Sequence, residues 1–125
     1  MTQLLMVGLG GFVGAIARYG ISGWIHRLTG PAFPYGTLAV NVAGCFLIGI
    51  FMTMVEVRQV FSPNLRLILM TGFLGSLTTF STFGYETVAL FRDGELGLGL
   101  GNMAANMLLG LFFVYLGSVV VKSVG

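Results

Sequence analysis

The segment from Thr71 to Glu86 holds the residues of this chain that are best suited to chemistry. Five hydroxyl side chains and two glycines fall between Gly72 and Thr82, inside a long apolar run. Lipid offers no hydrogen-bond partner to an exposed hydroxyl or to a distorted backbone. The segment must therefore face other protein groups or an internal polar path, which indicates that something polar is handled within a membrane.

The hydroxyl groups lead toward a carboxylate. Thr82 and Glu86 are four residues apart and share one helix face, and Ser81 lies about 100° around the helix from Thr82. At about 1.5 Å per residue, Glu86 lies roughly 10 Å from the centre of its span, within reach of the interfacial zone. A proton-coupling role for Glu86 is compatible with this position but is not required by it.

Two phenylalanines and the asparagines of other apolar stretches are candidates for binding an ion. Phe80 and Phe83 share one helix face, and packing is the ordinary role of such rings. Ring edges carry partial positive charge, however, so edges facing a void beside amide and hydroxyl donors would form a neutral shell for a small anion. Asn41 and Asn106 are the candidate amides, and Asn102 shares a helix face with Asn106. The alternative is that each amide simply hydrogen-bonds a neighbouring helix.

The middle of the same segment also favours a distorted backbone. Gly72 and Gly75, with the neighbouring serine and threonines, weaken a helix near the midpoint of its span. A break there would free carbonyl groups, including those of Gly75 and Thr78, and carbonyls without a carboxylate suit a dehydrated monovalent cation. Threonine hydroxyls that bond back to the preceding turn would instead only bend the helix. From these residues alone, the bend is the slightly favoured interpretation.

Composition assigns these residues to a membrane protein. The 125 residues form one domain by length, and 56% hydrophobic with 8% charged residues excludes an ordinary soluble domain. The net charge of +2 comes from isolated basic residues, which form no basic patch of the kind that binds nucleic acid. No enzyme constellation is present: the glycines from Gly8 to Gly14 lack the dinucleotide spacing, and His26 has no metal-ligating neighbours. The chain is not expected to be an enzyme.

Four apolar stretches are long enough to cross a bilayer, since a spanning helix needs about 20 residues. They cover residues 4–25, 36–55, 67–91 and 96–121. Helix-breaking or polar segments separate them, among them Thr29-Gly30-Pro31 and Arg92-Asp93-Gly94. The first stretch lacks a basic leader and contains Arg18, so we expect the first helix of the mature protein rather than a signal peptide.

The charges are nearly balanced across the membrane. With four spans, Arg58, Arg66 and Lys122 lie on one side, against Arg27 and Arg92, with Arg18 if its side chain extends that way, on the other. The positive-inside rule therefore gives almost no preferred orientation. Copies inserted both ways up could form an antiparallel dimer, while a weakly biased protein of one orientation remains equally open.

An oligomer is expected in either case. A four-helix bundle is barely wide enough to pack its own core, so a single copy makes a poor channel. Small residues four apart supply faces for close helix approach, as in Gly10/Gly14, Ala39/Ala43 and Gly97/Gly101. Arg18 lies deep enough in its span to require water or a partner, and would raise the local anion concentration at a vestibule.

Four motifs carry a resemblance to a known family. They are GxxGxxxR at residues 11–18, GTLxxN at 36–41, TGFLG at 71–75 and TTFSTF at 78–83. The last motif, together with Glu86, is the most specific. From about residue 10 to residue 117, the chain resembles the Fluc/CrcB family of bacterial fluoride channels.

The resemblance implies an all-α membrane protein whose third helix is broken near its midpoint. It implies an antiparallel, dual-topology homodimer in the inner membrane, with two pathways built from both subunits, that passively exports fluoride and so reduces its toxicity in the cytoplasm. It implies that backbone carbonyls of Gly75 and Thr78 hold a central structural sodium ion that is not transported. The residues assigned to each pathway are Asn41, Phe80, Phe83, Ser81, Thr82 and Glu86, with Asn106 at a position where some members carry serine or histidine.

Two other classes compete with a channel. A proton-coupled small multidrug exporter also has four spans, but it needs a carboxylate within the first helix, which here carries Arg18 and no acidic residue. A non-transporting assembly subunit would leave the cluster from Thr78 to Phe83 unexplained.

Overall fold

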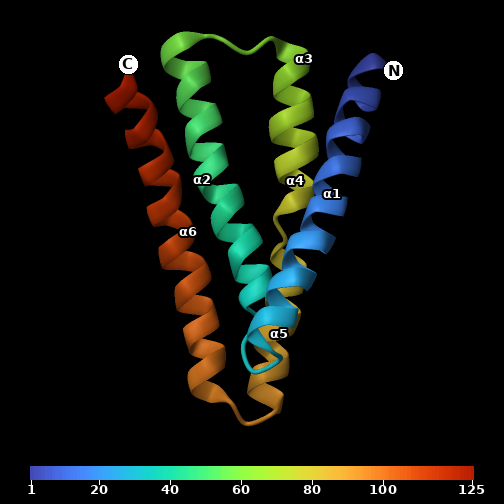
Figure 1. Ribbon diagram of the computed structural model, residues 1–125, viewed down its shortest axis with the longest axis vertical. Coiled ribbons are helices and arrows are strands. Elements are labelled where there is room, and N and C mark those ends of the chain that lie inside the picture. Colours follow the sequence, from blue (N-terminus) through green and yellow to red (C-terminus); the bar gives the residue numbers. More distant parts are fainter.

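Four long helical passages make up nearly the whole chain, and the computed structural model describes all residues, 1–125 (Figure 1). Each passage is long and apolar enough to cross a membrane, by length and composition. The four predicted stretches each lie within one passage, which confirms the prediction of four candidate spans. The passages are α1 (Thr2–Thr29), α2 (Tyr35–Arg58), a third passage over Pro63–Arg92, and α6 (Leu96–Val124).

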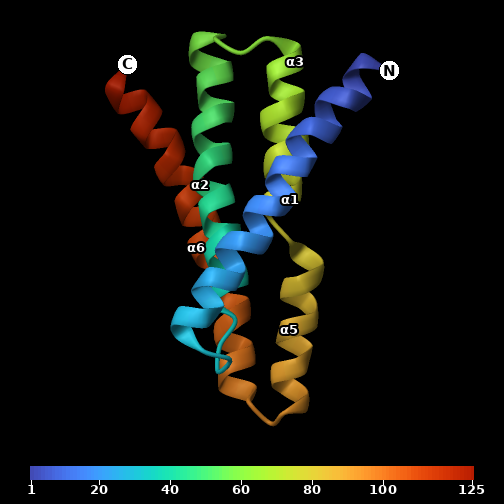
Figure 2. The same ribbon diagram turned by 45° about the vertical axis from the view of Figure 1, so that its right-hand side comes forward.

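Short turns connect the passages at alternating ends of the molecule. Gly30 ends α1 with a positive φ of 79° and donates its N–H to the His26 carbonyl at 2.8 Å. Gly94, also at φ 79°, lies in the turn before α6, where a residue with a Cβ would be strained. Both termini and the turn between α2 and α3 (Pro63–Arg66) lie at the same end (Figures 1 and 2). This is the arrangement that four passages require.

The third passage is not one continuous helix. It consists of α3, the π-helical segment η1 (Leu67–Leu74), α4 (Gly75–Leu77) and α5 (Phe80–Arg92). Between α4 and α5, Thr78 (φ −84°, ψ 156°) and Thr79 (φ −148°, ψ 120°) are extended, and Figure 2 shows the helix interrupted there. The third passage therefore bends near its midpoint, and two extended residues lie at the bend.

One hydroxyl at the interruption does make the expected local bond. The Thr78 hydroxyl donates to the Leu74 carbonyl at 3.0 Å, as a bent helix would require. The backbone N–H of Thr79, however, donates to Asn41 on α2 instead of to a carbonyl one turn earlier. The Thr79 N–H is therefore satisfied by a different helix rather than by its own.

Glycines let α1 and the third passage approach backbone to backbone. A Cβ at Gly10 would overlap the Ile68 carbonyl, and a Cβ at Gly14 would overlap the Phe73 carbonyl. Gly72 faces the Val7 carbonyl of α1 in the same way. The predicted small-residue face at Gly10 and Gly14 is thus used for packing within one chain.

The second close pair is α2 with α6. A Cβ at Gly49 would overlap the Val114 carbonyl, and one at Gly117 would overlap the Phe46 carbonyl. Gly97 and Gly101 have no neighbour within 4 Å of an added Cβ, so within the chain this pair makes no close contact. In Figures 1 and 2, α2 runs beside α6 and α1 beside the third passage.

The buried interior is small for a chain of this length. Only 18 of 125 residues are buried, and the hydrophobic core consists mainly of Val40, Leu74 and Leu77, packed around the interruption. Large apolar side chains of α1 and α6 are exposed instead. Outward apolar faces of this extent suit contact with lipid or with further protein rather than with water.

Candidate functional site

Asn41 holds the interruption in place through paired hydrogen bonds to one residue. Its Oδ1 accepts the backbone N–H of Thr79 at 2.8 Å, and its Nδ2 donates to the Thr79 carbonyl at 3.0 Å. An amide side chain has the same donor–acceptor pair as a peptide group, so Asn41 replaces the partners that helical neighbours would supply. The extended backbone at Thr79 is therefore satisfied although it lies inside a spanning segment.

Thr79 also starts the next helix. Its hydroxyl accepts the backbone N–H of Thr82 at 3.2 Å, the usual bond of an N-cap threonine, and contacts the Thr82 hydroxyl at 3.1 Å. The sequence thus places a helix-capping residue immediately before α5, where the break needs one.

The same bonds divert two backbone donors from their helical acceptors. In a continuous helix, the N–H of Thr79 would donate to the Gly75 carbonyl and that of Thr82 to the Thr78 carbonyl. Here the first donates to Asn41 and the second to the Thr79 hydroxyl. Gly75 and Thr78, whose carbonyls the sequence analysis named as candidate cation ligands, are thus the residues whose carbonyls lose these N–H partners.

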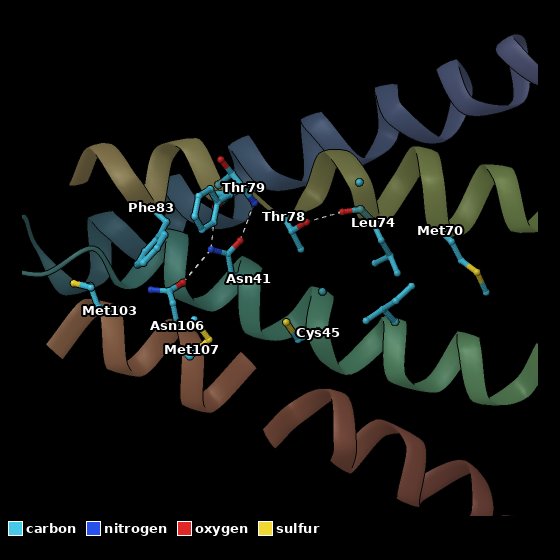
Figure 3. A pocket seen from close by; sticks show the side chains of 14 residues that line it. Asn41, Cys45, Met70, Leu74, Thr78, Thr79, Phe83, Met103, Asn106 and Met107 are labelled. Atoms are coloured by element: carbon cyan, nitrogen blue, oxygen red, sulfur yellow. Dashed lines mark hydrogen bonds between the residues drawn. The ribbon is translucent and has the colours of Figure 1, made fainter. Parts of the chain in front are cut away.

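A cavity of about 480 Å³ lies against the interruption, and six predicted site residues line it. Asn41 and Asn106 lie together in it, with Asn41 Nδ2 donating to Asn106 Oδ1 at 3.0 Å, as Figure 3 shows. Apolar and sulfur-containing side chains form most of the remaining wall, so the polar groups are few and local. The six residues are Asn41, Gly75, Thr78, Phe80, Phe83 and Asn106.

The two phenylalanine rings lie at the edge of this cavity. Their centroids are 5.6 Å apart, and the ring planes are tilted by 52°. Phe83 is half-buried, whereas 82% of Phe80 is exposed. The Phe80 ring contacts Phe83 but is otherwise largely uncovered by the chain, so most of its surface is available to an ion or to a second protein surface.

A second cavity of about 260 Å³ lies between α1, α2 and the start of α5. Arg18 contributes the only charged side chain to its lining, and Thr82 lies in the same wall. Thr79 lines both cavities, so the interruption separates the apolar cavity from the polar one. A cationic side chain beside hydroxyl groups produces a local field that attracts anions.

Glu86 is tied to α2 rather than to the hydroxyls of its own helix. Its Oε1 accepts the Thr37 hydroxyl at 2.8 Å, and Oε2 is buried without a partner. Thr37 lines the second cavity, which connects Glu86 to that wall indirectly. Ser81 is exposed and lines neither cavity, although its hydroxyl lies 3.5 Å from that of Thr79.

Several contacts in this region join residues that no local sequence pattern connects. Thr37 falls within a recognised motif, but nothing local connects it to Glu86, 49 residues later. In the sequence, Thr79 is not distinguished from the other hydroxyl residues between Gly72 and Thr82. Asn102 is 1% exposed and donates to the Thr87 hydroxyl at 2.9 Å. The shared face of Asn102 and Asn106 was the signal available for the fourth passage, and the structure shows these two amides bonded at 3.0 Å.

No group of three or more His, Cys, Asp or Glu side chains lies close enough to hold a metal ion. Backbone carbonyls beside the interruption are among the uncharged oxygens that line the cavity here. Uncharged oxygens of this kind suit monovalent rather than divalent ions.

Comparison with known proteins places the chain in a family. A family model described as "CrcB-like protein, Camphor Resistance (CrcB)" matches residues 5–118. A protein of Acidobacterium capsulatum named fluoride-specific ion channel FluC is 47% identical over 118 residues, covering 94% of each chain. Proteins of the same name from Geotalea uraniireducens and Rhizobium etli are each 46% identical over 123 residues, covering 98% of this chain and 99% and 98% of theirs. The chain therefore belongs to the CrcB-like family.

Proposed function

We propose that this protein is a fluoride-specific channel that exports fluoride passively and so lowers its toxicity in the cytoplasm. The observation that carries the proposal is 46–47% identity, over nearly full length, to relatives named fluoride-specific ion channels. The four candidate spans and the polar groups gathered at a helix break within one of them support it. Fluoride is small and strongly hydrated, so its selection requires a narrow site with many hydrogen-bond donors.

The proposed pathway begins at the second, polar cavity and continues past the interruption at Thr78 and Thr79. Arg18 attracts the anion to the cavity that Thr82 also lines, and Thr79 lies between this cavity and the larger one. Ring edges and amides then replace water around the ion. The proposed pathway residues are Arg18, Asn41, Phe80, Ser81, Thr82, Phe83, Glu86 and Asn106.

The amide groups of Asn41 and Asn106 already donate hydrogen bonds to protein groups in the structure. Asn41 uses both N–H bonds of Nδ2, one on the Thr79 carbonyl and one on Asn106 Oδ1. For Asn41 to donate to fluoride, one of these bonds must be exchanged for the ion. The bond to Asn106 is proposed to be the one exchanged for the ion, because both bonds of Asn41 to Thr79 stay in place when it opens.

A structural sodium ion is proposed at the carbonyls of Gly75 and Thr78. Both residues line the larger cavity, and the N–H groups that would occupy their carbonyls in a helix donate elsewhere. A bound cation would supply positive charge at the centre of an otherwise neutral region. Its role is to hold the break, and the ion is not transported.

An antiparallel homodimer is proposed as the working unit. The larger cavity is lined by Phe80 and Gly75, both exposed in the single chain, which leaves the ion site open on one side. Three basic residues at one end and two or three at the other give no strong orientation, so copies inserted both ways are expected. A second copy would close the cavity and supply further carbonyls to the sodium ion.

The membrane is proposed to be the bacterial inner membrane, and the protein is proposed not to be an enzyme. A proton-coupled multidrug exporter is the runner-up. It is disfavoured because α1 carries no acidic residue, and Glu86 lies in the third passage. An assembly subunit that transports nothing would have no need for a helix break held by the two Asn41–Thr79 hydrogen bonds.

Fluoride efflux from liposomes that contain only the purified protein tests the proposal. Rapid efflux of fluoride with no efflux of chloride from matched liposomes is expected. Equal leakage of both ions would reject selectivity, and the absence of any fluoride efflux from verified, folded protein would reject the channel. Efflux that depends on a proton gradient would favour the exporter.

A further inference from the structure

Three asparagine side chains connect the interruption to α6 and back to α5 in one hydrogen-bonded series. Thr79 N–H donates to Asn41 Oδ1 at 2.8 Å, and Asn41 Nδ2 donates to Asn106 Oδ1 at 3.0 Å. Asn106 Nδ2 donates to Asn102 Oδ1 at 3.0 Å, and Asn102 Nδ2 donates to the Thr87 hydroxyl at 2.9 Å. We call these four side chains and the Thr79 backbone the amide series.

The far end of the amide series returns to the helix that begins at the break. The Thr87 hydroxyl donates to the Phe83 carbonyl at 2.8 Å, one turn earlier in α5. The series therefore starts at the N-cap of α5 and ends within α5, after passing through α2 and α6. Asn102 and Thr87 are 1% and 5% exposed, and neither lines the larger or the second cavity.

The direction of every bond in the series follows from its two ends. A backbone N–H can only donate, so Asn41 must present Oδ1 to Thr79. Its Nδ2 then faces Asn106, which must present Oδ1 and turn its own Nδ2 toward Asn102, where the side-chain Oδ1 and the backbone carbonyl each accept from it at 3.0 Å. Asn102 must in turn direct its Nδ2 away, toward an acceptor, and the Thr87 hydroxyl is that acceptor. Reversing any one amide would set like groups against each other.

We propose that Asn102, held by Thr87, is a positioning residue that orients the amide of Asn106 and, through the Asn106–Asn41 bond, strengthens the bonds by which Asn41 holds Thr79 in its extended conformation. Without an acceptor at Thr87, Asn102 loses the partner that keeps its oxygen toward Asn106. Buried hydrogen bonds in series strengthen one another, so a loss at one end weakens the bond at the other. The flux consequences rest on the proposed channel function, whereas the effect on Thr79 does not.

The test uses two variants and a matched control. Asn102→Leu replaces the amide by an apolar side chain of similar size, and Thr87→Val removes the hydroxyl with little change of shape. Thr87→Ser keeps the hydroxyl and is the control. If a single variant does not fold, the double variant replaces it, since removing both partners leaves neither Asn102 nor Thr87 without the other, and Asn106 Nδ2 keeps the Asn102 backbone carbonyl as an acceptor.

The first readout is hydrogen exchange of the Thr79 N–H, followed by NMR on isotope-labelled protein without fluoride. Exchange is expected to speed up roughly fivefold to tenfold in Asn102→Leu and Thr87→Val, the size that loss of one hydrogen bond allows. It should be unchanged in Thr87→Ser. The Gln59 N–H, bonded to the Val55 carbonyl at the other end of α2, should be unaffected and serves as the internal reference.

The second readout is fluoride efflux per folded protein, which is expected to fall by a similar factor in both variants and to recover in Thr87→Ser. Folded variants with wild-type exchange at Thr79 would overturn the proposal and leave Asn102 as a packing residue only. Wild-type efflux despite faster exchange would overturn its link to transport. If the wild-type protein itself moves no fluoride, the proposed function fails, and the exchange experiment still decides the positioning role.

Discussion

The Thr37 hydroxyl donates to the Glu86 carboxylate at 2.8 Å and joins α2 to α5 across 49 residues of sequence. Thr37 is 7% exposed, and the second carboxylate oxygen has no partner. The bond therefore gives Glu86 its only side-chain donor in the chain. It also fixes the distance between the second cavity, which Thr37 lines, and the carboxylate.

Removing this donor is expected to destabilise the protein. Thr37→Val keeps the shape of the side chain but leaves the carboxylate without a donor, which costs about 1–3 kcal/mol. The free energy of unfolding in mixed micelles measures the loss. Thr37→Ser keeps the hydroxyl and should lie close to wild type, and equal losses in the two variants would show that the methyl group matters rather than the bond.

Phe80→Ile is expected to reduce fluoride efflux by about fivefold, because an aromatic edge contact worth on the order of 1 kcal/mol is removed from the proposed pathway. The ring is 82% exposed, so the fold of the single chain should be unaffected. Phe12→Ile is the matched control, since that ring is 68% exposed on α1. Unchanged efflux in Phe80→Ile would remove the ring from the pathway.

Asn41→Asp is expected to impair fluoride entry, because an aspartate carboxylate repels the anion. It is also expected to weaken the pair of hydrogen bonds between residue 41 and Thr79. An ionised aspartate still accepts the Thr79 N–H but cannot donate to the Thr79 carbonyl or to Asn106. Fluoride dependence of efflux in liposomes measures the effect, with about tenfold weaker apparent affinity expected for one lost charge-assisted contact. Asn64→Asp, in the exposed segment α3, makes the same chemical change away from the site. Wild-type affinity in the Asn41 variant would contradict a coordinating role.

Sodium replacement by a large organic cation on both sides of the membrane is expected to inactivate the protein. Such a cation is too large for the sodium site proposed at the Gly75 and Thr78 carbonyls, so the break would lose the positive charge proposed there. Efflux and the fraction of dimer are measured together at constant ionic strength, with return to sodium as the reversal. Full activity without sodium would reject this site.

Gly14→Ala is expected to destabilise the protein by about 1–3 kcal/mol, the usual cost of overpacking. A methyl group there would overlap the Phe73 carbonyl and crowd Ser76, and neither backbone can withdraw without separating α1 from η1. Gly97→Ala is the control, because an added Cβ meets nothing within 4 Å. Comparison of unfolding midpoints in the same detergent checks the difference. Equal midpoints would mean that the α1–η1 contact is looser than the structure indicates.

Local properties of the sequence were sufficient to predict the passages and their contents. Hydropathy and helix length depend on neighbouring residues only, so the four candidate spans followed from composition along the chain. The polar cluster around Thr78 and Thr79 stood out for the same reason. The family motifs directed attention to Asn41, Phe80 and Phe83, all of which line one cavity.

The tertiary structure alone decided how that cluster is used. Local bonding at Thr78 is compatible with a bend, and the extended backbone at Thr79 is satisfied by Asn41, 38 residues earlier in sequence, which accepts the Thr79 N–H. The partners of Glu86 and Asn102 were likewise set by which helices pack together. A hydrogen-bond partner on another helix leaves no periodic trace in the sequence, because its position depends on the packing of glycine faces such as those between α1 and η1.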